Sequence, residues 1–130
     1  MNYQIKVLRG LDGGNYIIVV AHGSVDITGF EQILDELIHA AKPLLDCKIL
    51  VDFQDSVFRL LHSDVIEFLA RVEPKRWPHN NKIAFICSLE RQQYRDLGML
   101  GDGLLKMKFE VGVFYEMREG IDWLSGTRSR

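Results

Sequence analysis

The stretch KILVDF, residues 48–53, decides the fold of this chain. Its apolar side chains are interrupted only by Asp52, and a nearly continuous apolar run of this length is typical of a strand that is covered on both faces. Such strands lie inside parallel sheets that carry helices. We therefore expect residues 48–53 to form a central strand of an α/β domain.

Two strands and a helix are predicted before this central strand. Residues 3–8 alternate polar and apolar side chains, residues 16–21 form a denser apolar run, and the glycine-rich segment 10–15 between them suits a hairpin turn. Residues 28–31, TGFE, fit a capping box at the start of a helix that Pro43 ends. The residues expected on the inner face of this helix recur at three- and four-residue spacing and are Phe30, Ile33, Leu34, Leu37, Ile38 and Ala41.

A second helix and a third buried strand are predicted after the central strand. A connection over residues 54–62 leads to the helix, which Ser63 or Asp64 can cap and which ends near Pro74. The side chains expected to point inward from it are Val65, Ile66, Phe68, Leu69 and Val72. Residues 82–87 then form another apolar strand, so that helix and strand alternate along the chain.

A third helix follows Ser88, which can cap its first turn. Its expected inner face consists of Tyr94, Leu97, Leu100 and Leu104. We expect its second half to fray or break, because Gly98, Gly101 and Gly103 each weaken a helix by up to about 1 kcal/mol relative to alanine. Residues 109–115 form the last predicted strand, and a short closing helix is expected to turn inward Met117, Ile121 and Leu124.

The predicted order of elements is β-β-α-β-α-β-α-β-α. Such alternation indicates an α/β fold with a single, mostly parallel sheet of about five strands, an N-terminal antiparallel hairpin and helices packed on the sheet. At 130 residues the chain has the usual length of one domain, so we expect residues 1–130 to form a single domain.

Composition and charge exclude several classes of function. The net charge of −2 provides no broad basic surface, so nucleic acid is not an expected partner. The sequence contains neither an apolar run long enough for a transmembrane segment nor a signal peptide, and we expect a cytoplasmic location. Cys47 and Cys87 fall at opposite ends of parallel strands and are expected to be buried without a disulfide. The four histidines lack ligand spacing, so neither a metal nor another cofactor is expected.

The element order resembles that of the SpoIIAA-like, or STAS-like, family. The resemblance rests on the polar loop after residues 49–53 and on the strand FEVGVF, residues 109–114, before a short helix that contains tryptophan. It implies a non-enzymatic domain, and in the anti-anti-sigma branch such domains bind a kinase and are switched by phosphorylation of a serine at the start of the second helix. Alignment on the central strand brings that switch motif to residues 60–63, LLHS, where only Ser63 matches and lies one place out of register. The chain is therefore similar to a divergent branch without the intact phosphoserine motif.

Polar residues are expected at the carboxyl ends of the strands, where α/β sheets bind ligands. This edge should bring together Asp52, Asp55, Ser56, Ser88 and Tyr115. Asp55 and Ser56 could contact a polar ligand or provide a phosphoacceptor. Both residue types are also common in turns, so a purely structural turn is the alternative. Ser63 suits either a helix cap or a phosphoacceptor at a helix N-terminus.

A surplus of apolar residues lies near the second and third helices. These side chains either close the core or line a groove. The candidate residues for binding a ligand or partner are Asp55, Ser56, Phe58, Leu61, His62, Ser63, Trp77, Ser88, Leu100 and Leu104, with Ser63 and Ser56 as candidate phosphoacceptors.

Three functional hypotheses follow. The first is a regulatory or binding domain that recognises a partner protein, or an apolar small molecule such as a lipid, through the second and third helices and adjoining strand ends. The second is an enzyme with Asp52 or Asp55 as acid or base, which a raised carboxylate pKa in that cleft would favour. The third is a structural module that forms a homodimer.

Overall fold

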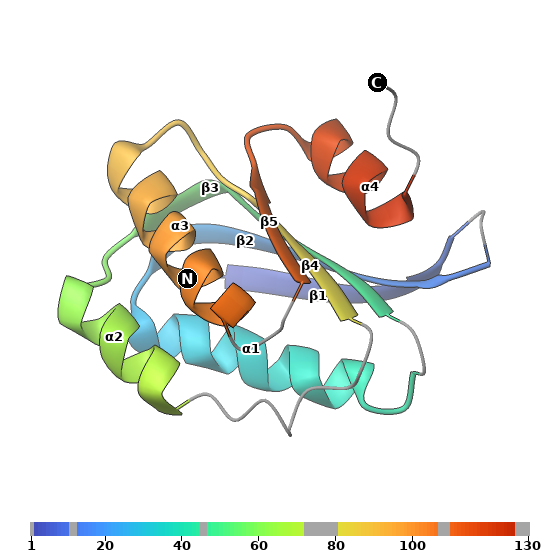
Figure 1. Cartoon of the computed structure of the whole chain (residues 1–130), viewed down its shortest axis with the longest axis horizontal. Coiled ribbons are helices and arrows are strands. Elements are labelled where there is room, and N and C mark those ends of the chain that lie inside the picture. Colours follow the sequence, from blue (N-terminus) through green and yellow to red (C-terminus); the bar gives the residue numbers. More distant parts are fainter. Residues whose placement is uncertain (1, 11–12, 45–46, 72–80, 107–109, 127–130) are drawn as a thin grey trace.

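The computed structural model describes residues 2–10, 13–44, 47–71, 81–106 and 110–126. Its elements follow the expected order (Figure 1). They are β1 (Asn2–Arg9), β2 (Asn15–Val25), α1 (Ile27–Ala41), β3 (Cys47–Phe58), α2 (His62–Arg71), β4 (Asn81–Ile86), α3 (Arg91–Lys106), β5 (Glu110–Phe114) and α4 (Met117–Ser125). In the described part of the chain, no helix has the length and apolar character needed to cross a membrane.

The five strands form one sheet in the order β1-β2-β3-β4-β5. β1 pairs with β2 in antiparallel fashion, and the remaining pairs are parallel. Ile17, Ile49, Ile83 and Val111 stand side by side across the four parallel strands. The predicted α/β class, with a mostly parallel sheet and an N-terminal hairpin, is confirmed.

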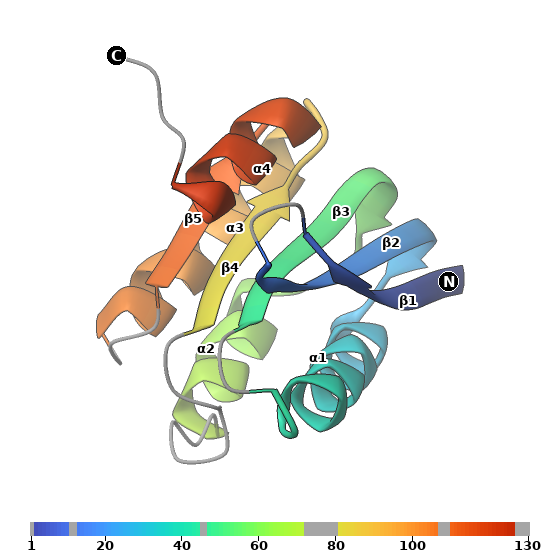
Figure 2. The ribbon, with the colours of Figure 1, turned by 90° about the vertical axis from the view of Figure 1, so that its right-hand side faces the viewer.

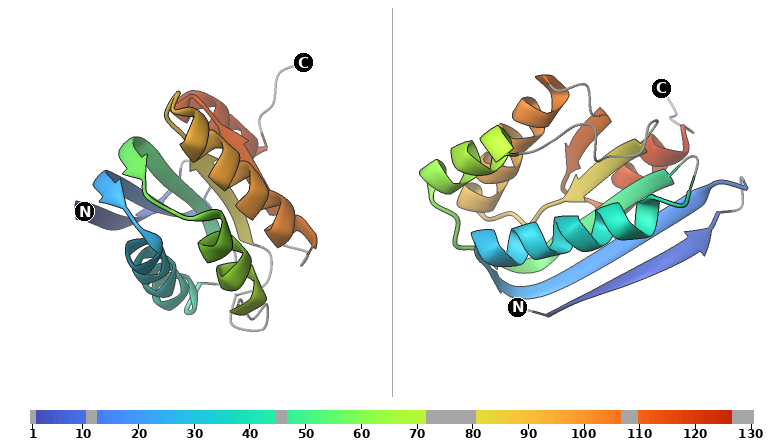
Figure 3. Two further views of the ribbon diagram at one scale, coloured as in Figure 1. Left: turned by 90° about the vertical axis from the view of Figure 1, so that its left-hand side faces the viewer. Right: turned by 90° about the horizontal axis from the view of Figure 1, so that it is seen from below.

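Helices cover both faces of the sheet. Residues of α1, α2 and α3 pack in one large core with Ile49, Val51 and Phe53 of β3. α4 packs on the other face, where Leu50 and Leu124 belong to a smaller core (Figure 2). Figure 3 shows α2 beside α3 on the face of the sheet that carries the larger core. Cover on both faces explains why residues 48–53 are almost continuously apolar.

β3 runs five residues beyond the predicted strand end at Phe53. The pairs Val20↔Asp52 and His22↔Asp55 show that β3 carries one more residue than β2 at this point, which is a β-bulge. Beyond the bulge, β3 stays paired with β2 as far as Phe58. The expectation of a connection starting at residue 54 was therefore wrong, because the bulge interrupts the alternation by which a strand is recognised.

The cap of α1 is Asp26 and not Thr28. The Asp26 Oδ1 atom accepts a hydrogen bond of 2.8 Å from the backbone N–H of Gly29. Thr28 is already the second residue of the helix. An aspartate satisfies a free N–H group as well as a threonine does, and the helix therefore begins two residues earlier than the TGFE pattern predicts.

The starts of α2 and α3 also differ from the prediction. Asp64, inside the first turn of α2, accepts a hydrogen bond of 3.0 Å from the backbone N–H of Leu61, so Ser63 is not the cap. The Ser88 hydroxyl accepts a bond of 3.2 Å from the N–H of Glu90, which directly precedes α3. Ser88 thus holds the turn that leads into the helix.

The glycines do not break α3, which is continuous as far as Lys106. A β-carbon at Gly103 would lie 2.6 Å from Leu69 Cδ1, and one at Gly101 would lie 3.5 Å from Val111 Cγ1. Gly103 therefore lets α3 approach α2 closely, whereas a β-carbon at Gly101 would make only an ordinary contact with β5. The expected break was wrong because packing against neighbours outweighs the low helix propensity of glycine.

Three residues expected to point inward are exposed: Ile66, Tyr94 and Ile121. α4 packs instead through Gly120, where a β-carbon would lie 2.5 Å from Ile86 Cδ1, and this close approach turns Ile121 outward. The Tyr94 ring stacks on the Tyr115 ring, with centroids 5.2 Å apart. The part of the predicted second helix from Val72 onward, the linker with Trp77, and residue 109 lie outside the described residues.

Candidate functional site

The polar residues expected at the strand ends lie on two different faces of the sheet. Asp52 follows Leu50 by two residues and therefore points toward the α4 face, where Gln54 donates a hydrogen bond of 3.0 Å to the Tyr115 carbonyl. Ser56 lies on the opposite face, with Phe58. The expectation of one cluster was wrong, because strand side chains alternate between the two faces.

Asp52 is the buried carboxylate on the α4 face, with 8% of its surface exposed. Its Oδ1 atom accepts a hydrogen bond of 2.9 Å from the backbone N–H of Gln54. Burial raises its pKa above the ordinary range for an aspartate, and the nearby charge of Asp55 raises it further, whereas the Gln54 bond and His22 lower it. The raised pKa of Asp52 is the property that the hypothesis of an acid or base requires.

Asp55 and Ser56 form part of a strand and do not form a turn. Asp55 is exposed and faces His22, with 3.7 Å between Oδ2 and Nδ1. Ser56 is buried, and its hydroxyl donates a hydrogen bond of 3.0 Å to the Ala21 carbonyl. By contrast, Ser63 is exposed in the first turn of α2, next to the exposed His62.

Gln93 joins the segments that meet beside the bulge, and the sequence interpretation missed it. Its amide group donates hydrogen bonds of 3.1 Å to the Phe53 carbonyl and 2.9 Å to the Ser56 carbonyl. Its Oε1 atom accepts a bond of 2.6 Å from the Ser88 N–H. A signal was present, because Gln93 shares the inner stripe of α3 with Leu97 at four-residue spacing.

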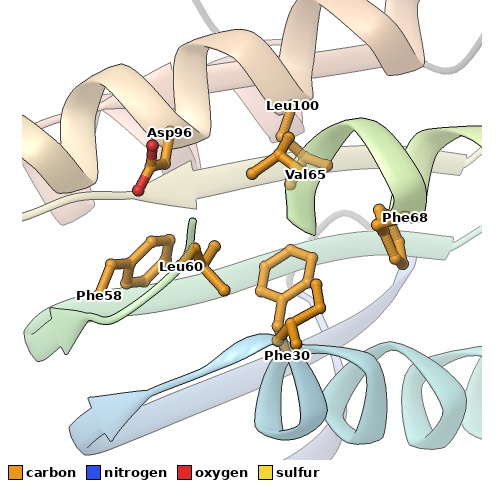
Figure 4. A pocket seen from close by; sticks show the side chains of 8 residues that line it. Phe30, Phe58, Leu60, Val65, Phe68, Asp96 and Leu100 are labelled. Atoms are coloured by element: carbon orange, nitrogen blue, oxygen red, sulfur yellow. The ribbon is translucent and has the colours of Figure 1, made fainter. Parts of the chain in front are cut away.

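A small apolar pocket lies between α1, α2, α3 and the end of β3 (Figure 4). Its volume, counted as the space open to the centre of a water molecule, is about 10 Å³. That space suits about one water molecule. The residues that line it are Ile27, Phe30, Phe58, Leu60, Val65, Phe68, Asp96 and Leu100. The pocket thus contains two predicted site residues, Phe58 and Leu100, and Leu104 belongs to the core beside it.

Phenylalanine rings form one side of this pocket. The Phe30 ring stands edge-on to the Phe68 ring at a centroid distance of 5.5 Å and to the Phe58 ring at 6.4 Å. Phe53 lies behind them, 4.9 Å from Phe58. Edge-to-face pairs have a preferred geometry, so Phe30 of α1 helps to fix the position of Phe68 of α2 and of Phe58 of β3.

Asp96 is the one residue with an ionisable side chain among the described residues that line the pocket. The sequence interpretation missed it as well. It is 8% exposed, and its Oδ2 atom has no hydrogen-bond partner among the residues that the structure describes. Burial raises its pKa; the charge of Arg95, a hydrogen bond with Gln92 and the charge of His62 lower it, and Glu90 raises it. In Figure 4 its carboxyl group points from α3 toward the side of the pocket formed by Phe58.

Two exposed leucines lie on the loops beside the pocket. Leu61 precedes α2 and is 67% exposed, and Leu89 precedes α3 and is 86% exposed. A hydrogen bond of 3.2 Å from the Gln92 amide, in the first turn of α3, to the Leu60 carbonyl joins the loop before α2 to α3. We call Leu61 and Leu89 the apolar rim.

Neither cysteine adds reactive chemistry to the site. Cys47 and Cys87 are buried and free, as expected. Burial raises the pKa of the Cys47 thiol to about 11, so it stays protonated at neutral pH. Within the described ranges, no three His, Cys, Asp or Glu side chains are grouped closely enough to hold a metal ion.

Comparisons with known proteins concern the fold. No protein-family model and no curated protein matches the sequence. An uncharacterised protein of the DUF3478 family from Shewanella loihica PV-4, with a SpoIIAA-like fold, superposes with a TM-score of 0.58 at 19% identity, over 94% of this chain and 93% of that chain. The anti-sigma factor antagonist SpoIIAA in its unphosphorylated form superposes with a TM-score of 0.51 at 16% identity, over 96% of this chain and 99% of that chain. With the strand order and helix placement described above, these likenesses show that the chain has a SpoIIAA-like fold.

Proposed function

We propose that this chain is a non-enzymatic binding domain that holds an apolar small molecule between α2 and the rest of its helical face. The observation that carries this proposal is the apolar pocket whose lining includes a carboxylate oxygen, Asp96 Oδ2, without a hydrogen-bond partner in the described part of the chain. A buried polar group without a partner is uncommon in folded proteins, and ligand sites combine apolar walls with a few polar groups. In the conformation described, the pocket is water-sized, so a larger molecule requires α2 to move outward.

α2 is the helix best suited to such a movement. Only Val65 and Phe68 of α2 are buried, whereas α1 and α3 each bury six residues. Exposing these two side chains costs about 3 to 6 kcal/mol at roughly 1.5 to 3 kcal/mol each. Burying an eight-carbon chain returns about 6 kcal/mol at roughly 0.8 kcal/mol per methylene group, which offsets the opening.

A disulfide between α2 and α3 tests this proposal. Leu69 Cγ lies 3.2 Å from the place of a β-carbon at position 103, so the Leu69→Cys/Gly103→Cys variant brings two thiols within reach of each other. The neutral fluorescent probe N-phenyl-1-naphthylamine should bind the reduced variant and lose at least about tenfold in affinity on oxidation. The single Leu69→Cys variant, treated in the same way, is the control. Equal affinity of the oxidised and reduced forms would contradict the proposal.

One observation favours the alternative hypothesis of an enzyme: the pKa of Asp52 is raised. However, Asp52 points to the α4 face, whereas the pocket lies on the opposite face of the sheet. One carboxylate oxygen of Asp52 is already bonded to the Gln54 N–H. A bound substrate in the pocket would therefore have no contact with this carboxylate.

A partner protein is the second candidate, and the apolar rim favours it. Leu61 and Leu89 expose most of their side chains on the loops that precede α2 and α3. Native mass spectrometry of gently purified protein tests this candidate against the Leu61→Ser/Leu89→Ser variant. A retained polypeptide, or a second copy of this chain, that is lost only from the variant would support docking at the rim. Retention by both proteins would contradict it.

A further inference from the structure

We propose that the pocket selects an organic cation, an ammonium group attached to an apolar body, with Asp96 as its counter-ion. This inference rests on the proposed function and adds the charge of the ligand. The two observations behind it are the Asp96 Oδ2 atom, which has no partner among the described residues, and the phenylalanine rings that line the same pocket.

The position of Asp96 is fixed by its neighbours on α3. Gln93 and Leu97 are both fully buried, and they hold the stripe of α3 that contains Asp96 against β3 and the core. Asp96 is itself more than nine-tenths buried. Asp96 is therefore held in the wall of the pocket, with its carboxyl group on the side formed by Phe58 (Figure 4).

Among the described residues, the lining of the pocket provides no donor for this oxygen. Apart from Asp96, all the lining side chains are aliphatic or aromatic. Gln92 forms a hydrogen bond with Asp96, but not through Oδ2. Arg95 and His62 influence Asp96 electrostatically, but both are exposed and neither lines the pocket. Water screens their charges, so a donor that enters the pocket has the Oδ2 atom to itself.

A cation satisfies this site better than a neutral or negative group does. A hydrogen bond from an ammonium to a carboxylate is charge-assisted and stronger than one from a neutral hydroxyl. Phe30 and Phe58 add aromatic rings, whose faces attract cations. A carboxylate ligand would instead bring a second negative charge next to Asp96, which repels it.

Three probes that share an eight-carbon chain test the inference: octylammonium, 1-octanol and octanoate. Isothermal titration calorimetry at pH 7 should show octylammonium binding at least about tenfold more tightly than 1-octanol, with octanoate weakest. In Asp96→Asn, the preference for octylammonium over 1-octanol should fall to about one while the binding of 1-octanol persists. The matched control is Asp102→Asn, which removes the same charge from an exposed position of α3 and should keep the preference.

The outcomes separate this inference from the proposed function. Equal affinity for the three probes would overturn the cation preference and leave the apolar pocket standing. Binding of none of them would overturn both. A preference lost equally in Asp102→Asn would show that overall charge is responsible, and a single tightly held water on Asp96 with no effect of any probe would assign the carboxylate to hydration alone.

A measurement on the unaltered protein guards against misfolding of Asp96→Asn. Carboxyl ¹³C NMR follows the ionisation of Asp96 directly. Bound octylammonium should move the titration midpoint of Asp96 to lower pH, because a cation stabilises the ionised form, and 1-octanol should not. Equal midpoints with both probes would contradict a direct contact between the ammonium and Asp96.

Discussion

Gly103 of α3 faces Leu69 of α2 so closely that a side chain at position 103 would force the Leu69 side chain to shift. A β-carbon at position 103 would lie 2.6 Å from the Leu69 Cδ1 atom. α2 therefore packs on α3 at a glycine, and its buried side chains are Val65 and Phe68, two of the residues that line the pocket. Arg71 at the end of α2 also donates a hydrogen bond of 3.0 Å to Glu31 of α1. The two side chains that α2 buries thus also form part of the pocket wall.

Gly103→Ala and Gly98→Ala should have opposite effects on stability. Both substitutions gain up to about 1 kcal/mol of helix propensity. A β-carbon at Gly98 meets nothing within 4 Å, so Gly98→Ala should raise the free energy of unfolding. Gly103→Ala should lower it, because overpacking costs about 1 to 3 kcal/mol. Urea denaturation measures both, and equal stabilisation by the two variants would contradict the close packing of α2 on α3.

Gln93→Ala should be strongly destabilising. It leaves the carbonyls of Phe53 and Ser56 and the N–H of Ser88 without their partner. Each buried group left unsatisfied costs about 1 to 3 kcal/mol, so the free energy of unfolding should fall by about 3 kcal/mol or more. Gln92→Ala is the control: it removes an exposed side chain that bonds to the Leu60 carbonyl and to Asp96, and it should cost less, about 1 to 2 kcal/mol. Equal losses in urea denaturation would show that Gln93 does not hold these segments together.

Stability should depend on pH through Asp96. Burial raises its pKa in the folded protein, so the native state binds more protons than the unfolded state between the two pKa values. The free energy of unfolding therefore falls as the pH rises through that interval. Asp96→Asn lacks this loss. The free energy of unfolding of the variant minus that of the wild type should therefore increase as the pH rises, and then level off. A difference that stays constant from acid to neutral pH in thermal unfolding would argue against a raised pKa.

Phosphorylation, if a kinase acts on the folded chain, should reach Ser63 and not Ser56. The Ser56 hydroxyl is buried and bonded to the Ala21 carbonyl, whereas Ser63 is exposed. Incubation with host lysate and ATP, followed by mass analysis of the intact protein and its peptides, should place any added phosphate on Ser63. Absence of phosphate would count against a switch, and phosphate on Ser56 would contradict the described burial.

The sequence was sufficient for the order and type of the elements. Residues 48–53 are recognisable because a strand covered on both faces needs few polar side chains. The extension of β3 through Asp55 to Phe58 was not recognisable, since the bulge shifts the alternation and makes the segment look like a loop. Local sequence patterns thus predict helices and strands well. They do not predict a feature such as the bulge, which depends on pairing with a neighbouring strand.

The site was predicted only in part, for the same reason. Phe58 and Leu100 were identified from an excess of apolar residues, but their meeting with Phe30 and Val65 depends on the tertiary fold. Asp96 lies on the inner side of α3, near Leu97 and Leu100, and its spacing was visible in the sequence. A polar residue on such a stripe has several explanations, and only the structure shows that one of its oxygens has no partner.

The most direct test of a ligand pocket under α2 is a two-dimensional ¹H–¹⁵N NMR titration with N-phenyl-1-naphthylamine. The account predicts saturable shifts of backbone amides in α2, in the first turn of α1 and around Leu100 of α3, which surround the pocket, and little change in α4. Shifts centred on Asp52 and Tyr115, or no saturable shifts at all, would contradict it.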